Sequence, residues 1–355
     1  MAMLCAKSAW QMRLNHFNFL SHEADGETMT QQFKESALGI EKFGIGQPVR
    51  RSEDPVLVRG EGCYSDDVNL EGQLFGVMVR SPVAHAVLRG VDTHAALAVK
   101  GVLAVYTAKD LEPMGYGLIR CALPITNHDG SPMRGNGRSA LAHGKVRYVG
   151  DPVAFVVAIS REAAIDGAEA VQLDLESLPA VTTPHEAIQD AAPLLDETVP
   201  NNIAVDFHWG DKQKTEAAFK KAAHITKLAL DNNRVVVAAM EPRSALAFYD
   251  AKKGDYTLHA NSQGVFGMRA NLSAILGIPA EKMHIRTGHV GGSFGMKISI
   301  FPEYICLLHA ARQLGKPVKW TDRRSDSFLS DFHGRDTDVV AELALDAKGH
   351  FLAIR

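Results

Sequence analysis

The sequence predicts a mixed α/β fold of two domains. A chain of 355 residues is too long for one ordinary core, and about 150 residues per domain gives roughly two units. Short apolar runs alternate with helical segments of about ten residues, which is typical of layered α/β proteins. Hydrophobic residues make up 46% and charged residues 22%, so we expect packed globular cores.

The expected domain organisation follows from where the regular patterns begin and stop. Residues 1–42 show no sustained period, and we expect a poorly ordered extension with a true start at Met1 or Met29. Prolines gather near residue 190 and mark a boundary. We therefore predict a first domain over 43–190, a linker over 191–208 and a second domain over 209–355.

In the first domain, residues 43–70 are rich in turn formers and predict loop and edge strand rather than helix. Ser160 is placed to cap one helix, and Asp92 or Thr93 to cap another. The run 152–159 is almost wholly apolar, as in a strand that is buried on both faces. The predicted strands are 74–80, 86–91, 102–107, 152–159 and 171–176, and the predicted helices are 95–99 and 161–170.

In the second domain, Asp211 caps a lysine-rich helix whose charges indicate a solvated face. Asn261 or Ser262 is expected to cap a helix that ends at Leu276, and Pro302 begins another that Gly315 closes. The predicted strands are 225–230, 244–249, 256–260, 283–287, 337–345 and 351–355. Since no turn or polar tail follows the last strand, we expect this domain to be incomplete at Arg355.

Composition and spacing argue against several functions. A net charge of −3 disfavours polyanionic partners, and no apolar run reaches the 18 or so residues of a membrane span. The four cysteines form no C-x-x-C pair, which fits a reducing, cytoplasmic location and argues against an iron–sulfur cluster in this chain. No two histidines have the i, i+4 spacing of metal ligands, so we expect no side-chain metal site.

The glycine-rich segment 288–297 is compatible with several chemistries. A Walker phosphate loop needs Lys followed by Ser or Thr, but Ile298 follows Lys297. The segment 291–295 matches G-x-S-x-G, which would make Ser293 an acyl-transfer nucleophile, but the next helix begins only at Pro302 and 62 residues remain after Ser293. A main-chain cradle for an anionic group and a plain tight turn both stay open.

Further motifs join the glycine loop along the chain. They are Gly46-Gln47-Pro48-Val49-Arg50-Arg51, Asp54, Gly60-Glu61-Gly62-Cys63-Tyr64-Ser65-Asp66-Asp67, Arg80-Ser81-Pro82-Val83-Ala84-His85-Ala86, Tyr148-Val149-Gly150-Asp151-Pro152-Val153-Ala154, Met240-Glu241-Pro242-Arg243, Asn261-Ser262-Gln263-Gly264-Val265 and Gly291-Gly292-Ser293-Phe294-Gly295-Met296-Lys297. Together they resemble the molybdenum-binding large subunit of the xanthine dehydrogenase and aldehyde oxidase family. The resemblance covers about 43–355, and its first part looks like that family's hammerhead domain.

The resemblance implies a molybdenum–pterin cofactor, expected in its cytosine dinucleotide form, held without a direct side-chain ligand to the metal. It places Gln263, at the start of a helix, as donor to the metal's oxo or hydroxyl oxygen. It places Gly292, Phe294 and Gly295 in a main-chain cradle, with the Phe294 ring shielding the site from water; Phe294 as plain core is the alternative. Arg243 is expected to pair with Glu241 or with an anion.

The same resemblance implies partners and limits. Iron–sulfur clusters and FAD would lie on separate small and medium subunits, and a complementary C-terminal polypeptide would complete this one. Ile298 replaces a purine-binding glutamate, which favours the branch of carbon monoxide dehydrogenase or of aldehyde and N-heterocycle oxidoreductases. The family's general-base glutamate falls beyond residue 355, so no catalytic residue is assigned and the chain alone is expected to be inactive. A non-catalytic remnant or split-gene half that binds a partner is the alternative.

Overall fold

The computed structural model describes residues 51–121, 125–135 and 137–355. The predicted extension over 1–42 lies outside these residues. The chain divides into one unit up to Glu61 and a second from Gly62 to Arg355. In the first unit the described part contains α2 (Asp54–Leu57), and the second begins with a 3-10 turn, η1 (Ser65–Asp67). The prediction of loop and edge strand over 43–70 was therefore wrong at these two turns; Pro55 suits the first turn of a helix, where its missing N–H has no partner to lose.

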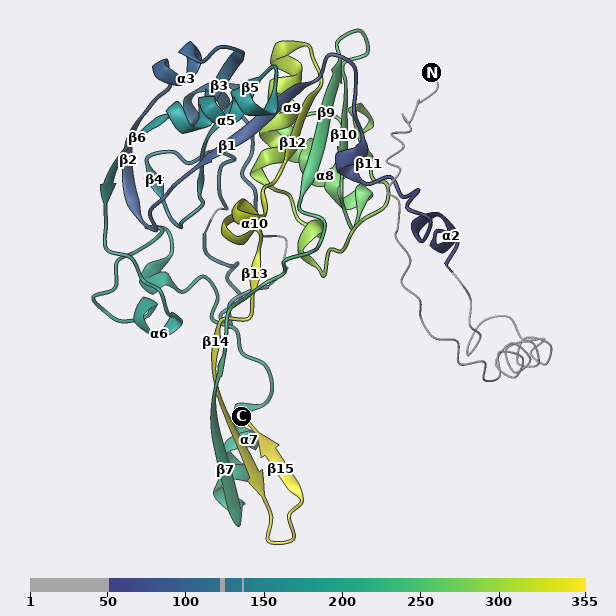
Figure 1. Cartoon of the computed structure of the whole chain (residues 1–355). Helices are drawn as coiled ribbons and strands as arrows, with labels where there is room; N and C mark the ends of the chain where they lie inside the picture. Colours follow the sequence, from purple (N-terminus) through teal and green to yellow (C-terminus); the bar gives the residue numbers. More distant parts are fainter. Residues whose placement is uncertain (1–50, 122–124, 136) are drawn as a thin grey trace, which may run out of the picture. The chain divides into compact units, whose positions relative to one another are not determined.

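The centre of the second unit is a seven-stranded mixed sheet (Figure 1). Its pairs are antiparallel except for β1 with β12 and β10 with β11. In spatial order the strands are β11 (Met283–Arg286), β10 (Asp255–Ala260), β9 (Ser244–Asp250), β12 (Val318–Thr321), β1 (Leu74–Arg80), β5 (Pro152–Ala158) and β3 (Val102–Thr107). This sheet takes strands from both predicted domains, which therefore share one framework.

Helices cover this sheet because its strands are apolar on both faces. α5 (Arg161–Ala170) packs on β1 and β5, α9 (Pro302–Leu314) packs on β9 and β12, and α8 (Val265–Leu276) packs on β11. Every residue of β5 is buried. At Gly76 of β1 an added Cβ would lie 2.2 Å from the Phe155 ring, so the ring occupies the space that a side chain there would need.

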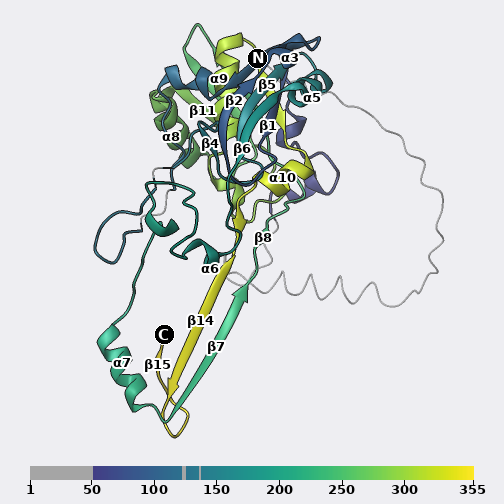
Figure 2. The same cartoon turned by 90° about the vertical axis from the view of Figure 1, so that its left-hand side faces the viewer.

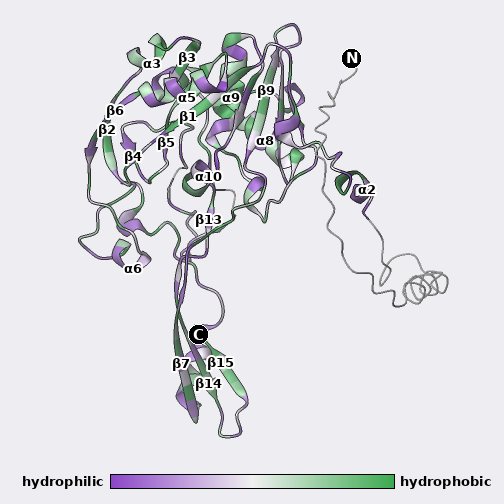
Figure 3. Ribbon diagram, viewed as in Figure 1, coloured by the Kyte–Doolittle hydropathy of each residue, from purple (hydrophilic) through white to green (hydrophobic). Residues whose placement is uncertain are grey.

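Three smaller sheets complete the unit. They are β4 (Lys145–Val146) with β2 (Ala86–Asp92) and β6 (Gln172–Ser177); β15 (Phe351–Ile354) with β14 (Thr337–Leu345) and β7 (His224–Asn232); and β13 (His333–Gly334) with β8 (Val235–Val236). Figure 2 shows β7 and β14 running side by side as a long ribbon, with α7 (Lys212–Lys221) beside it. Hydrophobic and hydrophilic stretches both occur along this ribbon (Figure 3).

The remaining elements are short and connect the sheets. They are α3 (His94–Ala98), α4 (Ala108–Leu111), η2 (Glu112–Met114), α6 (Pro184–Ala187), η3 (Pro200–Asn202), η4 (Ala280–Lys282), η5 (Met296–Ile298) and α10 (Arg324–Ser330). Within the described ranges, every helix is too short or too polar to span a bilayer.

The mixed α/β fold and most predicted elements are confirmed. Ser160 caps α5 by accepting from the Ala163 N–H at 3.2 Å, and Asp211 caps α7 by accepting from Lys214. The predicted cap of α8 was wrong: the N-cap is Gly264, while Ser262 instead accepts from the Gly264 N–H in the preceding turn. β12 was not predicted, because a four-residue strand carries too little pattern to be recognised. The short helix α10 was not predicted either.

Candidate cofactor site

The glycine-rich segment 288–297 is a loop between β11 and α9, and three of its residues have left-handed backbone angles. Gly292 and Gly295 have φ of +95° and +92°, and Phe294 has φ of +51°. Glycine adopts this region freely, whereas a side chain there costs about 1 kcal/mol or more. The conformation at Phe294 must therefore be enforced by contacts on either side of it.

Glu241 and Lys297 hold the loop in this conformation through hydrogen bonds. The Gly291 N–H donates to a Glu241 carboxylate oxygen at 2.8 Å, and the Glu241 N–H donates back to the Gly291 carbonyl at 3.1 Å. The Lys297 ammonium, which is fully buried, donates to the same carboxylate at 2.9 Å and to the Glu241 carbonyl at 2.8 Å. An added Cβ at Gly291 would lie 2.6 Å from the Glu241 Cβ, so only glycine fits this approach.

Burial and pairing with Glu241 shift the pKa of the Lys297 ammonium in opposite directions. Burial lowers the pKa of its ammonium below the ordinary value, and the hydrogen bond and charge of Glu241 oppose that shift. The pair is thus a buried structural clamp, whose separation would leave a charge without compensation. The sequence motif Met-Glu-Pro-Arg contains Glu241, but nothing in it indicates a partner 56 residues away.

Arg243, two residues further on, does not pair with Glu241 as predicted. Its fully buried guanidinium lies 3.8 Å from the centre of the Phe301 ring. Burial alone would lower the pKa of the Arg243 guanidinium, but the negative charges around it raise that pKa overall. The carboxylates that it contacts are Glu303 at 3.0 Å, Asp322 at 3.3 Å and Asp331 at 2.6 Å. The Arg243 guanidinium is fully engaged with these three carboxylates, so it cannot bind an external anion.

The start of the loop is fixed by the segment that follows Gly62. The His289 N–H donates to the Cys63 carbonyl at 3.0 Å, and the Cys63 N–H donates to His289 Nδ1 at 2.9 Å. An added Cβ at Gly288 would lie 2.6 Å from that carbonyl oxygen, so the close pairing requires glycine. Segments far apart in the sequence therefore hold the loop at both ends.

Gln263 lies beside the other end of the loop. Its backbone N–H donates to the Lys297 carbonyl at 3.3 Å, and the neighbouring Ser262 N–H donates to the Thr287 hydroxyl at 3.3 Å. The prediction that Gln263 begins a helix was wrong, because α8 starts two residues later, at Val265. Its side chain is exposed, and the amide makes no hydrogen bond to any described residue.

Between these supports the loop presents free main-chain donors. In the described part of the chain, no acceptor takes the N–H groups of Gly292, Phe294 or Gly295, and the last two residues are exposed. Gly295 has open space where a Cβ would be. Successive unpaired N–H groups in a concave turn attract negatively charged oxygens. The residues present therefore fit an anionic, oxygen-rich group such as a pterin phosphate.

The Phe294 ring flanks this cradle. A Cβ at Gly292 would lie 2.9 Å from the ring, and the residue as a whole is 79% exposed. The alternative that Phe294 is plain core is therefore wrong. A large apolar ring held in the open by a strained backbone has no packing role in the described residues.

Ser293 is not arranged as a nucleophile. The residue is buried, and its hydroxyl oxygen accepts from the Lys297 N–H at 3.0 Å, which closes the turn leading into η5. The acyl-transfer reading of G-x-S-x-G has no support in this geometry, since a nucleophile elbow needs the hydroxyl exposed at the top of the turn.

Comparison with known proteins agrees with the fold. Residues 59–179 match the model of the aldehyde oxidase and xanthine dehydrogenase a/b hammerhead domain, and residues 195–355 match that of the molybdopterin cofactor-binding domain. The two matches thus describe a hammerhead domain followed by a molybdopterin cofactor-binding domain. The chain belongs to the aldehyde oxidase and xanthine dehydrogenase family.

Within this family the similarity to bacterial hydroxylase subunits is marked. The chain is 36% identical over 333 residues to the carbon monoxide dehydrogenase large chain of Afipia carboxidovorans, covering 90% of this chain and 40% of that protein. It is 34% identical to the nicotine 6-hydroxylase large subunit of Paenarthrobacter nicotinovorans, covering 88% and 37%. The structure of reconstituted CO dehydrogenase from Oligotropha carboxidovorans superposes with a TM-score of 0.79 at 36% identity, covering 88% of this chain and 39% of that one. The chain thus spans about 40% of the length of the curated relatives that it matches.

Proposed function

We propose that this chain is the N-terminal part of the molybdenum cofactor-binding large subunit of a hydroxylase that oxidises carbon monoxide, an aldehyde or an N-heterocycle with oxygen from water. The observation that carries the proposal is the set of free N–H groups at Gly292, Phe294 and Gly295, held on an exposed loop next to Gln263. Similarity to a carbon monoxide dehydrogenase and to a nicotine hydroxylase supports the range of substrates.

In this proposal the chain binds and orients the cofactor. The cradle N–H groups donate to its anionic oxygens, and the Gln263 amide donates to an oxygen on the metal. The Phe294 ring excludes water on one side, and the Glu241–Lys297 clamp holds the loop rigid. When bound, the molybdenum–pterin group, in its cytosine dinucleotide form, supplies the two-electron oxidation. No residue of this chain is assigned as the general base.

The proposal also includes protein partners. An iron–sulfur small subunit and an FAD medium subunit would take up the electrons, as the separate large subunits among the relatives suggest. The polypeptide corresponding to the remaining length of those relatives would complete the site. It would dock on the ribbon of β7, β14 and β15, where large apolar side chains are exposed: Ile225, Leu228, Leu230, Val340, Phe351 and Ile354.

The exposed ribbon also favours a second candidate, a non-catalytic module that only binds a partner. The two candidates differ in metal and pterin content, because a module of this second kind has no use for the cradle. Molybdenum and pterin at one equivalent each in the purified assembly support the hydroxylase. An assembly that retains its partner polypeptide but contains neither supports the binding module.

Replacing the proposed amide donor gives the sharper test. In the assembled enzyme, Gln263→Ala should lower hydroxylation by about 100-fold, as loss of one aligned donor does in other enzymes, while molybdenum content stays unchanged. Gln172→Ala is the matched control, because Gln172 is also exposed and makes no side-chain hydrogen bond to a described residue. Equal turnover of the two variants would reject the role of Gln263.

A further inference from the structure

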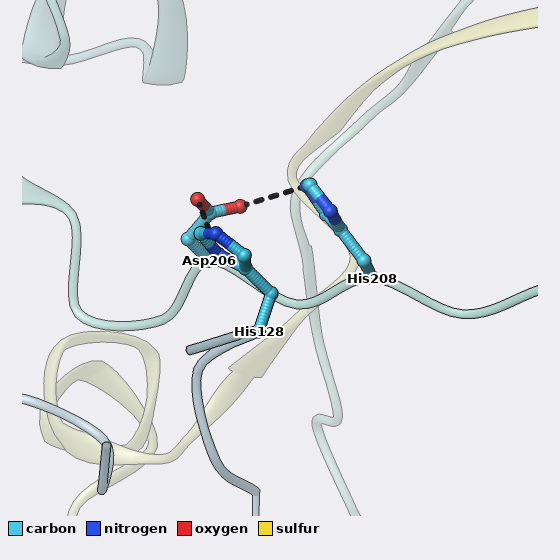
Figure 4. A group of neighbouring side chains, drawn as sticks. All are labelled: His128, Asp206 and His208. Atoms are coloured by element: carbon cyan, nitrogen blue, oxygen red, sulfur yellow. Dashed lines mark ion pairs between the residues drawn. The ribbon is translucent and has the colours of Figure 1, made fainter. Parts of the chain in front are cut away.

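Two histidines and an aspartate meet at the surface, away from the glycine loop in sequence. They are His128, Asp206 and His208 (Figure 4), and their nearest ligand atoms all lie within 4.8 Å of one another. His128 Nδ1 is 3.2 Å from one Asp206 carboxylate oxygen, and His208 Nε2 is 3.3 Å from the other. The two imidazole rings stack with their centres 4.8 Å apart. The sequence predicted no side-chain metal site, because the ligands come from segments 78 residues apart.

The loops that carry these residues are joined by their own backbones. The His128 N–H donates to the Asp206 carbonyl at 2.8 Å, and the Arg134 N–H donates to the Ala204 carbonyl at 2.8 Å. The buried Asn127 side chain accepts from the Asp206 N–H at 2.8 Å. Its amide nitrogen donates to the Pro132 carbonyl at 2.8 Å, which fixes the turn. The three candidate ligands therefore stand on a framework that is formed without any ion.

Two imidazole nitrogens and a carboxylate suit a borderline divalent ion such as Zn²⁺ rather than Ca²⁺ or Mg²⁺, which prefer oxygen ligands. Bonds of about 2.0–2.1 Å in a tetrahedron place neighbouring ligand atoms about 3.3 Å apart. The two nitrogen-to-oxygen separations are of that length, but each goes to a different oxygen of the Asp206 carboxylate. One ligand atom from each of the three residues lies within 4.8 Å of the other two. To bind one ion, the two stacked imidazole rings must turn so that one nitrogen of each faces the same point beside the carboxylate. Three protein ligands then leave the fourth tetrahedral position to water.

Only exposed contacts hold these three side chains together among the described residues. His128, Asp206 and His208 are each about half exposed or more, and ion pairs at such positions contribute about 0–1 kcal/mol. We infer that His128, Asp206 and His208 form a binding site for Zn²⁺ or a similar divalent transition metal, which clips the loop at 125–135 to the segment at 203–208. The inference does not rest on the proposed function.

Zinc titration of the full 355-residue chain, stripped of metal with a chelator and followed by calorimetry, tests the site. The chain should bind one saturable equivalent of Zn²⁺ that is lost in His208→Ala. His350→Ala is the matched control, because His350 Nδ1 lies 2.9 Å from an Asp346 carboxylate oxygen in an exposed pair with one histidine instead of two. This control should keep the equivalent.

A second readout is independent of other zinc-binding groups in the chain. Zn²⁺ should slow amide hydrogen exchange in 125–135 and 203–208 in the unchanged chain and in His350→Ala, but not in His208→Ala. The inference is overturned if His208→Ala binds the same number of equivalents with the same affinity, or if both variants lose the equivalent together.

Discussion

Two strands of this chain both carry apolar side chains but have opposite surroundings. Every residue of β5 is buried, in a seven-stranded sheet with α5 packed against it. Every residue of β7 is exposed, in a three-stranded sheet with β14 as its only neighbour. The apolar side chains of β5 pack against other parts of the chain, whereas those of β7 are not covered by any of the described residues.

The contrast extends to the charged groups. Around the glycine loop, the charges of Lys297 and Arg243 are buried and paired with carboxylates, and such groups fix a conformation. On the ribbon, the Lys227 side chain that pairs with Glu342 is largely open to water, and a pair with one exposed member contributes little. The molecule thus combines a rigid base under the candidate site with a surface that lacks a covering layer.

The largest expected effect is in the buried strand. Phe155→Ala removes a fully buried ring that fills the space above Gly76, and should lower the free energy of unfolding by about 3–5 kcal/mol. Urea unfolding followed by circular dichroism measures the change. A loss below 1 kcal/mol would mean that β5 is not the centre of the core.

The clamp under the loop should come next. Glu241→Ala leaves the buried Lys297 ammonium without its partner and should cost about 3 kcal/mol. Glu176→Ala is the control, because its carboxylate lies 2.6 Å from the Arg89 guanidinium in an exposed pair, which water screens, so its loss should cost much less. Equal losses of unfolding free energy in the two variants would contradict the distinction between buried and exposed ion pairs.

Acid should weaken the core through His309. This residue lies in α9 beside Tyr106 and Tyr116, and burial lowers the pKa of its imidazole from 6.5 to about 4. The unfolded chain therefore takes up the proton first, so the stabilisation present above pH 6.5 is lost as the pH falls towards 4. Between pH 7 and pH 5 the loss should be about 2 kcal/mol.

The measurement compares urea unfolding at pH 7 and pH 5 in the unchanged chain and in His309→Gln. The glutamine keeps a hydrogen-bonding group for the Tyr116 hydroxyl, which lies 3.1 Å from His309 Nδ1, but does not titrate. The variant should lose less stability on acidification than the unchanged chain. The same pH dependence in both would show that His309 is not responsible.

The smallest effect on the chain alone is expected on the ribbon. Leu228 is 53% exposed in β7, so Leu228→Ala should change the free energy of unfolding by less than about 0.5 kcal/mol. In the assembly with the completing polypeptide, the same change should weaken association, which calorimetric titration of the two chains measures. Unchanged association would remove this face from the proposed interface.

Sequence patterns located the buried strands and the capped helices well. Continuous apolar runs such as 152–159 and caps such as Ser160 act locally, and local signals can be read from neighbouring residues. The glycine loop was recognised because its backbone needs glycine at fixed positions, as at Gly291 and Gly292.

The features that could not be predicted from the sequence depend on contacts between residues far apart in the chain. β12 joins the two halves of the large sheet, yet its four residues give no distinctive pattern. The pairing of Glu241 with Lys297, and the meeting of His128 with Asp206, depend on how distant segments are brought together. The expected role of Arg243 was wrong for the same reason, since its carboxylate partners lie 60 or more residues away.

The central claim, that the loop at 288–297 cradles a molybdenum–pterin cofactor, is tested most directly by closing the cradle at Gly295. Gly295→Ala adds a methyl group at φ +92°, where the space is open, and Gly72→Ala adds one at φ +69° in an exposed turn. Both changes should cost about 1 kcal/mol in backbone strain. Molybdenum and pterin measured per assembled protein should fall sharply in Gly295→Ala alone. Full occupancy in Gly295→Ala, equal to that of Gly72→Ala, would contradict the account.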